Sequence, residues 1–149
     1  ITRAQFAAMF YRLAGQPETD GESKFTDLTQ DWYRKAVSWA AASGVIAGTG
    51  DTTFSPDMTV TREQIAAIFY RYAQSKGLDV SAGEDSDLSY RDSGDISDYA
   101  VLPMKWCFRE NIMFICSPDG YEYIIGPRVT PSRADTATMF SKFAYFLNN

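Results

Sequence analysis

The chain has 149 residues, of which 45% are hydrophobic and 15% aromatic, so it is long enough to bury a sizeable core. Its net charge of −5 and its acidic isoelectric point argue against a nucleic acid as partner. No apolar run approaches the ~18 residues that a membrane-spanning helix requires. Histidine is absent, which removes the most common general base and most zinc sites. We therefore expect a globular protein without membrane insertion, metal or cofactor.

The first expected element is a helix over residues 1–14, which the Gly-Gln-Pro of residues 15–17 ends. Its apolar face has helical period and consists of Phe6, Met9, Phe10 and Leu13. The polar residues 18–24 are expected to form a linker. Because the chain begins at Ile1 inside a repeated pattern, we expect it to be part of a longer polypeptide.

Residues 25–74 form one complete unit of helix, glycine-rich loop and helix. We expect Asp31 to be the N-cap of the first helix and Gly44 to end it. The apolar face expected for this helix consists of Trp32, Ala36, Trp39, Ala40 and Ser43. The loop over residues 48–51 contains glycines that allow positive φ. Thr61 then starts the second helix, with a capping box to Gln64. The apolar face of this helix consists of Ile65, Ile68, Phe69 and Tyr72.

Residues 75–89 are expected to form a second linker, and residues 90–146 repeat the helix–loop–helix unit with drift. The same six-residue spacing separates a proline from the arginine at the start of the last helix of each unit. Tyr99 stands in the place of Trp32, and Ile115 replaces the loop glycine Gly48. Pro103 is expected near the first turn of its helix, where the missing N–H costs least.

An arginine stands directly after the helix cap in all three copies of the repeated start, at Arg3, Arg62 and Arg133. A cation there opposes the helix dipole, at a cost of about 0.3–1 kcal/mol when it is exposed. One explanation is that the arginine and the free N–H groups of the helix start hold an anion. The other is that each arginine pairs with an aspartate or glutamate and fixes its helix to a neighbour. The sequence leaves both explanations open.

The motif order of the central unit resembles that of the S-layer homology module of bacterial cell-surface proteins. The matching elements are Phe25, Asp27, Trp32, the Gly-Val-Ile-Ala-Gly of residues 44–48, Phe54, Pro56 and the Thr-Arg-Glu-Gln of residues 61–64. On this resemblance the chain holds the last helix of a first module at 1–14, a complete second module at 25–74 and a degenerate third module at 90–146. The resemblance implies a mainly α fold of tandem helix–loop–helix repeats in a pseudo-threefold assembly.

The resemblance also implies a non-catalytic function outside the cell, at the bacterial cell surface or S-layer. Such modules anchor exported proteins to the wall by binding an anionic, often pyruvylated, secondary cell-wall polysaccharide in grooves between modules. The residues that the resemblance assigns to ligand binding are Arg3, Arg62, Arg133, Trp32, Tyr99, Asp27, Asp92 and Gly48. Core packing is the competing role for Trp32, and fixing a loop or cap is the favoured role for Asp27 and Asp92.

Three departures from the family pattern bear on this assignment. Gln5, Gln64 and Asp135 occupy the position of the family's glutamate, so two copies lose its charge. The third module lacks the loop glycine, and the first lacks its front half in this chain. We therefore expect any groove that depends on those parts to be impaired.

A second hypothesis is a structural module, whose repeats pack against other domains or other copies in a surface layer without binding a ligand. A third is a calcium loop, since oxygen-bearing side chains alternate at Asp51, Thr53, Ser55 and Asp57. However, Pro56 and Arg62 occupy the positions where a calcium loop needs glycine and a bidentate glutamate. An enzyme is not expected, because no facing pair of carboxylates stands out.

Cys107 and Cys116 have no metal-binding spacing and form no Cys-x-x-Cys motif. Cys107 replaces Ala40 of the preceding unit on a helix. We therefore favour a buried, inert thiol over a disulfide.

Overall fold

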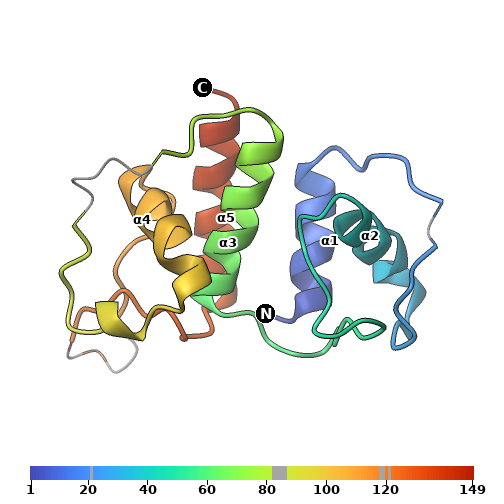
Figure 1. Cartoon of the computed structure of the whole chain (residues 1–149), viewed down its shortest axis with the longest axis horizontal. Helices are drawn as coiled ribbons and strands as arrows, with labels where there is room; N and C mark the ends of the chain where they lie inside the picture. Colours follow the sequence, from blue (N-terminus) through green and yellow to red (C-terminus); the bar gives the residue numbers. More distant parts are fainter. Residues whose placement is uncertain (21, 82–86, 118–119, 121) are drawn as a thin grey trace. The chain divides into compact units, whose positions relative to one another are not determined.

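A computed structural model describes the chain at residues 1–20, 22–81, 87–117, 120 and 122–149. These residues contain helices and two isolated bridges but no β-strand, so the predicted mainly α class is confirmed. No helix among them is long and apolar enough to span a membrane. The elements are α1 (Arg3–Leu13), α2 (Asp31–Ala42), α3 (Arg62–Ser75), η1 (Ser93–Asp95), η2 (Asp98–Ala100), α4 (Val101–Arg109) and α5 (Arg133–Leu147) (Figure 1).

The chain divides into two compact units, unit 1 at Ile1–Val60 and unit 2 at Thr61–Asn149. Each unit begins with a helix that starts Thr-Arg and continues with the helix and loop that follow it in the sequence. The repeat boundaries at 1–14, 25–74 and 90–146 and the pseudo-threefold assembly remain predictions.

Helices α1, α3 and α5 all begin with a capping box, as the sequence predicted. The cap side chains of Thr2, Thr61 and Ser132 each accept a hydrogen bond from the N–H three residues on, and the side chain there returns one. The prediction of Asp31 as the cap of α2 was wrong, because the extended backbone of the cap belongs to Gln30 (φ −122°). Asp31 instead places its carboxylate in the first turn, where the helix dipole favours an anion.

In unit 1, α1 packs against α2, and Phe10 stacks on Trp39 with ring centroids 6.2 Å apart. The predicted apolar face of α2 was wrong at its edges. The helix buries Tyr33 and leaves Trp32 57% exposed. The hydroxyl of Tyr33 accepts hydrogen bonds from the N–H groups of Thr29 (3.1 Å) and Gln30 (3.2 Å), just before the helix. This satisfies two backbone donors just before the helix, and it fixes which side of α2 turns inward.

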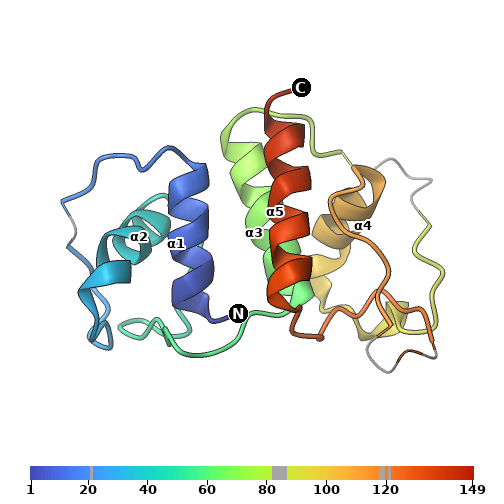
Figure 2. The same ribbon diagram turned by 180° about the vertical axis from the view of Figure 1, so that it is seen from behind.

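In unit 2, α3, α4 and α5 share an aromatic core, and α3 lies beside α5 in both views (Figures 1 and 2). Phe69 of α3 stacks on Phe143 of α5 with centroids 4.2 Å apart, and the buried Trp106 of α4 contacts Phe143 edge-on. The predicted apolar face of α3 is confirmed, since all four of its members are buried. Pro103 is the third residue of α4, so its predicted place in the first turn is also confirmed.

Both cysteines are free. Cys107 is completely buried, as predicted, and burial raises the pKa of its thiol well above the ordinary value. Cys116 is only partly buried, and the carbonyl and N–H of its backbone pair with those of Ile124 in an isolated bridge.

Candidate functional site

Arg3 connects the start of α1 to the loop that follows α2. Its Nε donates to the carbonyl of Phe54 (2.8 Å), and its Nη2 donates to the carbonyl of Ala47 (2.6 Å). The guanidinium also lies over the Phe54 ring, 4.6 Å from the ring centroid. Arg3 is 9% exposed, and this burial lowers the pKa of its guanidinium, which the charge of Asp27 partly opposes. The side chain therefore holds the two ends of the loop together.

Arg62 repeats this arrangement in unit 2. Its Nε donates to the carbonyl of Ile125 (2.8 Å), and its Nη2 donates to the carbonyl of Phe114. Only 1% of Arg62 is exposed, and burial lowers the pKa of its guanidinium. The charged group is thus enclosed by its own unit.

Backbone groups complete each contact. The N–H groups of Arg3 and Ala4 donate to the carbonyls of Met58 (2.8 Å) and Pro56 (3.0 Å). In unit 2, the N–H groups of Arg62 and Glu63 donate to the carbonyls of Val129 (3.0 Å) and Pro127 (2.9 Å). We call this set of donors, the arginine side chain and the first two helical N–H groups, the arginine socket. It satisfies N–H groups that every helix start leaves unpaired.

The socket answers the question that the sequence left open about these arginines. Among the described residues, neither Arg3 nor Arg62 forms an ion pair within 4 Å with an aspartate or glutamate, so the explanation by a carboxylate partner does not hold for either. Their partners are backbone carbonyls. Arg133 differs, because it lies exposed at the start of α5. Ligand contact by any of the three remains a prediction.

Asp27 and Asp92 fix the same loops from the other side. The carboxylate of Asp27 accepts hydrogen bonds from the N–H groups of Phe54 (2.9 Å) and Ser55 (2.7 Å). Asp92 accepts equivalent bonds from Ile125 (3.1 Å) and the next residue. Burial raises the pKa of Asp27, but the hydrogen bonds to its charged form outweigh burial and lower the pKa overall. Both aspartates therefore have the loop-fixing role that the sequence favoured.

Gly48 lies where the loop of unit 1 passes closest to its core. A Cβ at this position would come within 2.4 Å of Cε1 of Phe25 and 2.6 Å of the carbonyl oxygen of Thr53. The expected use of positive φ at residues 48–51 was wrong for both glycines there. The left-handed residues of the loop that follows α2 are Gly44, with a φ of 70°, and Ser55, with a φ of 58°. Packing against Phe25 therefore explains the glycine.

Tyr99 is tied to the start of α3. Its hydroxyl donates to the carboxylate of Glu63 (3.3 Å), which also accepts hydrogen bonds from the N–H and the hydroxyl of Ser97 (both 3.0 Å). Burial, followed by the nearby charge of Glu63, raises the pKa of Tyr99. The ring itself stays 52% exposed, so contact with a ligand remains a prediction.

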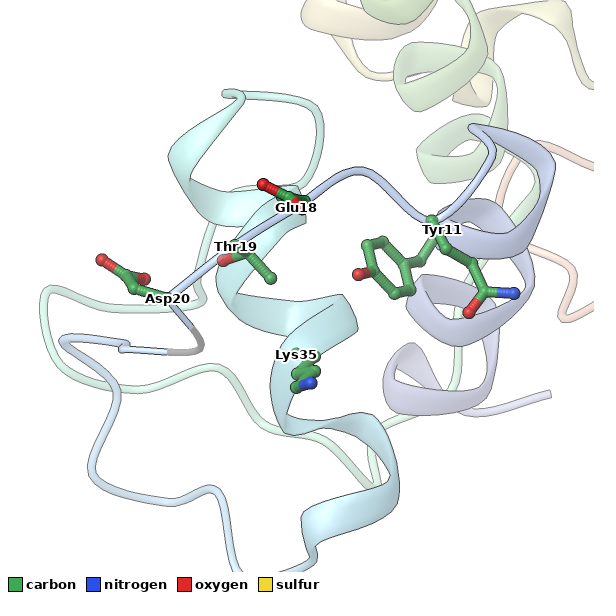
Figure 3. A pocket seen from close by; sticks show the side chains of 6 residues that line it. Tyr11, Glu18, Thr19, Asp20 and Lys35 are labelled. Carbon is green, nitrogen blue, oxygen red and sulfur yellow. The ribbon is translucent and has the colours of Figure 1, made fainter.

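The described residues of unit 1 include a groove between α1 and α2, which we call the α1–α2 groove. Its inner end has a volume of about 240 Å³ and is lined by Ala8, Tyr11, Arg12, Gln16, Asp31, Trp32, Lys35 and Ala36. Its outer end, about 630 Å³, is lined by Tyr11, Gln16, Glu18, Thr19, Asp20 and Lys35. Figure 3 shows Tyr11 directed from α1 toward the segment of residues 18–20 and Lys35 on α2.

The charges of the groove are divided along its length. Arg12 and Lys35, both exposed, bring two cations to the inner end, beside the exposed ring of Trp32. Asp31 is the acidic residue at that end, and it pairs with Arg34 at 3.5 Å. The outer end is acidic, through Glu18 and Asp20. The inner end thus combines an aromatic face with two cations, which suits a ring-shaped ligand that carries a negative charge.

The corresponding surface of unit 2 differs in charge. In the repeat alignment Tyr99 takes the place of Trp32, and Arg71 takes the place of Arg12. Lys35, however, is replaced by Leu102, which is 57% exposed. Unit 2 therefore lacks one of the two cations that mark the groove of unit 1.

Sequence reasoning predicted Trp32 but missed Arg12, Lys35 and Tyr11. The Tyr-Arg pair was visible as a recurring feature, since it returns at residues 70–71. Lys35 follows Trp32 by one helical turn and so shares its face. Arg12 and Lys35 lie on opposite walls of one groove because of the way α1 packs on α2. Neither the recurring Tyr-Arg pair nor the helical spacing reveals this packing.

Comparisons with known proteins agree with this architecture. Residues 24–66 match the family model of the S-layer homology domain. The chain is 32% identical over 141 residues to an endoglucanase of Bacillus sp. (strain KSM-635), which covers 95% of this chain and 14% of that protein. It is 29% identical over 97 residues to a cellulosome-anchoring protein of Acetivibrio thermocellus, which covers 62% of this chain and 22% of that protein.

The same organism has a cell surface glycoprotein 1 that is 33% identical over 85 residues, which covers 54% of this chain and 4% of that protein. The chain thus spans less than a quarter of each of these relatives. The matched segment contains α2, its loop and the start of α3, and Arg3 and Asp27 bind that loop through hydrogen bonds. The chain therefore carries an S-layer homology domain at residues 24–66.

Proposed function

We propose that the chain is a non-catalytic module that anchors its polypeptide to the bacterial cell wall, and that it binds an anionic secondary cell-wall polysaccharide. The proposal of cell-wall anchoring is supported by the S-layer homology match and by relatives named as a cellulosome-anchoring protein and a cell surface glycoprotein. Two further relatives are named as an endoglucanase and an amylopullulanase, but the chain covers only 14% and 5% of them. We assign catalysis in such proteins to their other parts, and we place the module outside the cell.

The observation that carries the proposal of polysaccharide binding is that the exposed ring of Trp32 lines the same groove as Arg12 and Lys35. A large aromatic residue left 57% exposed on a helix is available to stack on a sugar face. A guanidinium and an ammonium beside it can bind a carboxylate or a pyruvyl ketal through charge-assisted hydrogen bonds. The volume of about 240 Å³ at the inner end is close to the lower limit of ligand pockets, so it suits one acidic sugar unit.

In this proposal Arg3 and Asp27 serve binding indirectly. They hold the loop of unit 1 from both sides, and so keep α1 and α2 at a fixed separation. Asp92 and Arg62 do the same for the loop of unit 2. We propose the groove of unit 1 as the main site, because unit 2 lacks the counterpart of Lys35.

The test is a titration of the chain with purified, pyruvylated cell-wall polysaccharide. We expect Trp32→Ala to weaken binding about tenfold or more, because the stacking surface is lost. Lys35→Ala and Arg12→Ala should each weaken it about five- to tenfold, since each removes a charge-assisted hydrogen bond. Higher salt should also weaken binding by wild type, because exposed charges are screened.

Matched controls separate the groove from general effects. Tyr145→Ala removes an aromatic side chain that is 72% exposed on α5, and Lys24→Ala removes an exposed lysine outside the groove. Both should bind as wild type does. The proposal fails if Trp32→Ala and Lys35→Ala bind no more weakly than these controls, or if chemically depyruvylated polysaccharide binds equally well.

The second candidate function is the structural module. It is favoured by the burial of Arg3 and Arg62, whose guanidinium groups serve the loops of their own units. On this hypothesis the wild-type chain shows no saturable binding of wall polysaccharide. The same titration therefore separates the two functions.

A further inference from the structure

The outer end of the α1–α2 groove has no role in the binding proposed above. It is the larger part of the groove, about 630 Å³ against about 240 Å³, and it shares Tyr11, Gln16 and Lys35 with the inner end. The two ends are therefore continuous. When an acidic sugar of a polysaccharide lies against Trp32, the outer end has room for the neighbouring sugar of the same polymer.

The wall of the outer end is held in place by the turn that follows α1. Gln16 has a left-handed backbone, with a φ of 52°, and its N–H donates to the carbonyl of Tyr11 (2.9 Å). The hydroxyl of Tyr11 donates to the carbonyl of Pro17 (2.8 Å), which fixes the chain just after this turn. Residues 18–20 then run along the groove, with Lys35 on α2 across from them (Figure 3). The outer end thus has a wall of defined position.

The charge of the outer end is opposite to that of the inner end. Glu18 and Asp20 are both exposed, and within the described part of the chain neither has a lysine or arginine within 4 Å. Asp20 accepts a hydrogen bond from the N–H of Glu22 (3.0 Å), which orients its carboxylate and leaves the negative charge in place. Lys35 lines both ends, so an acidic sugar at the inner end shares this cation. The outer end therefore repels a second acidic sugar and attracts a positive charge.

We propose that the outer end binds an amino sugar whose amine is protonated, so that the groove selects a polysaccharide in which an acidic sugar neighbours an amino sugar. This inference rests on the proposed function, because the acidic sugar at the inner end is what places its neighbour. The ammonium group donates charge-assisted hydrogen bonds to Glu18 and Asp20. An N-acetylated sugar is neutral at this position and gains none of this attraction.

The test is calorimetric titration of the full chain with two synthetic disaccharides. In both probes a hexosamine that carries a pyruvyl ketal is joined to a second sugar, which is glucosamine in one and N-acetylglucosamine in the other. We expect wild type to bind the glucosamine probe about three- to tenfold more tightly, because its ammonium group meets two carboxylates. Glu18→Gln and Asp20→Asn should each reduce this preference, and the double variant should abolish it. The affinity for the N-acetylglucosamine probe should not fall in these variants.

Asp51→Asn is the matched control, because Asp51 is an exposed aspartate of unit 1 that lies outside the residues lining the groove. It should keep the full preference of wild type. If wild type binds both probes equally, and Trp32→Ala weakens both, this inference is overturned while the proposed function stands. A preference that survives unchanged in the double variant also overturns it. If neither probe binds wild type, or if Trp32→Ala binds both as wild type does, the proposed function fails and this inference fails with it.

Discussion

Replacing Arg62 by alanine tests the structural role of the arginine socket. The guanidinium is 1% exposed and donates from Nε and Nη2 to the carbonyls of Ile125 and Phe114. These carbonyls lie at the two ends of the loop of unit 2, so the substitution releases both ends at once. The account predicts a large loss of stability in unit 2, although no charged side chain lies within ion-pair distance of Arg62 among the described residues.

The size of the loss follows from the contacts. A hydrogen bond to a charged group contributes about 1.5–3 kcal/mol, and here two are removed together. The buried stem of the side chain leaves a cavity as well, so we expect the free energy of unfolding to fall by about 3–5 kcal/mol. Arg133→Ala provides the matched control, because that arginine is exposed and should change stability by less than about 0.5 kcal/mol.

The assay is urea unfolding followed by the NMR signal of the Trp106 indole, which lies in the core of unit 2. With a slope of about 1–3 kcal/mol per molar urea, Arg62→Ala should lower the midpoint by about 1–5 M. Arg62→Lys should recover only part of the loss, since an ammonium lacks the fork that reaches two carbonyls. If Arg62→Ala shifts the midpoint no more than Arg133→Ala, the reasoning about the socket is refuted.

Three further predictions concern unit 1 and the cysteines. The pKa of Asp27 is lowered in the fold, so its contribution to stability should be complete above its unfolded pKa of about 4 and fade as the pH falls further. In Asp27→Asn the melting temperature should therefore fall less as the pH is lowered through the acid range. An equally steep fall in the variant would contradict the assignment. Gly48→Ala should destabilise unit 1 by about 1–3 kcal/mol in urea unfolding, since the added Cβ would meet Phe25 and a carbonyl. Gly50→Ala should cost less, because its Cβ would meet only the side chain of Thr53. Equal losses of stability in the two variants would count against the packing argument. In the native chain Ellman's reagent should leave Cys107 unmodified until urea unfolds unit 2, whereas rapid reaction with Cys107 would show that its burial is incomplete.

Much of the fold could be predicted because its signals are local. A threonine or serine cap followed three residues later by Gln5, Gln64 or Asp135 predicts a capping box, and all three boxes form. The helical period of the apolar residues of α3 likewise predicts its buried face. At α2 the period alone could not decide between Trp32 and Tyr33. The hydroxyl of Tyr33 decided it by accepting hydrogen bonds from the backbone before the helix.

The roles of the arginines could not be predicted in the same way. The sequence marks Arg3 and Arg62 as unusual, but their partners are backbone carbonyls, and every residue has one. Only the path of the loop shows which carbonyls are within reach. The α1–α2 groove poses a similar problem, since Arg12 and Lys35 belong to different helices and meet only after these pack. The sequence predicted the aromatic residue of the groove, and the structure adds its cations.

The most direct test of the proposed binding site follows the three tryptophan indole N–H signals of the chain by NMR during titration with a pyruvylated wall-polysaccharide fragment. Trp32 is exposed in the groove, whereas Trp39 packs on Phe10 and Trp106 is buried in unit 2. The account predicts a saturable shift of the Trp32 signal, with the Trp106 signal unmoved, and saturation of that shift at an about five- to tenfold higher concentration in Lys35→Ala. Saturable binding that leaves Trp32 unshifted would contradict it.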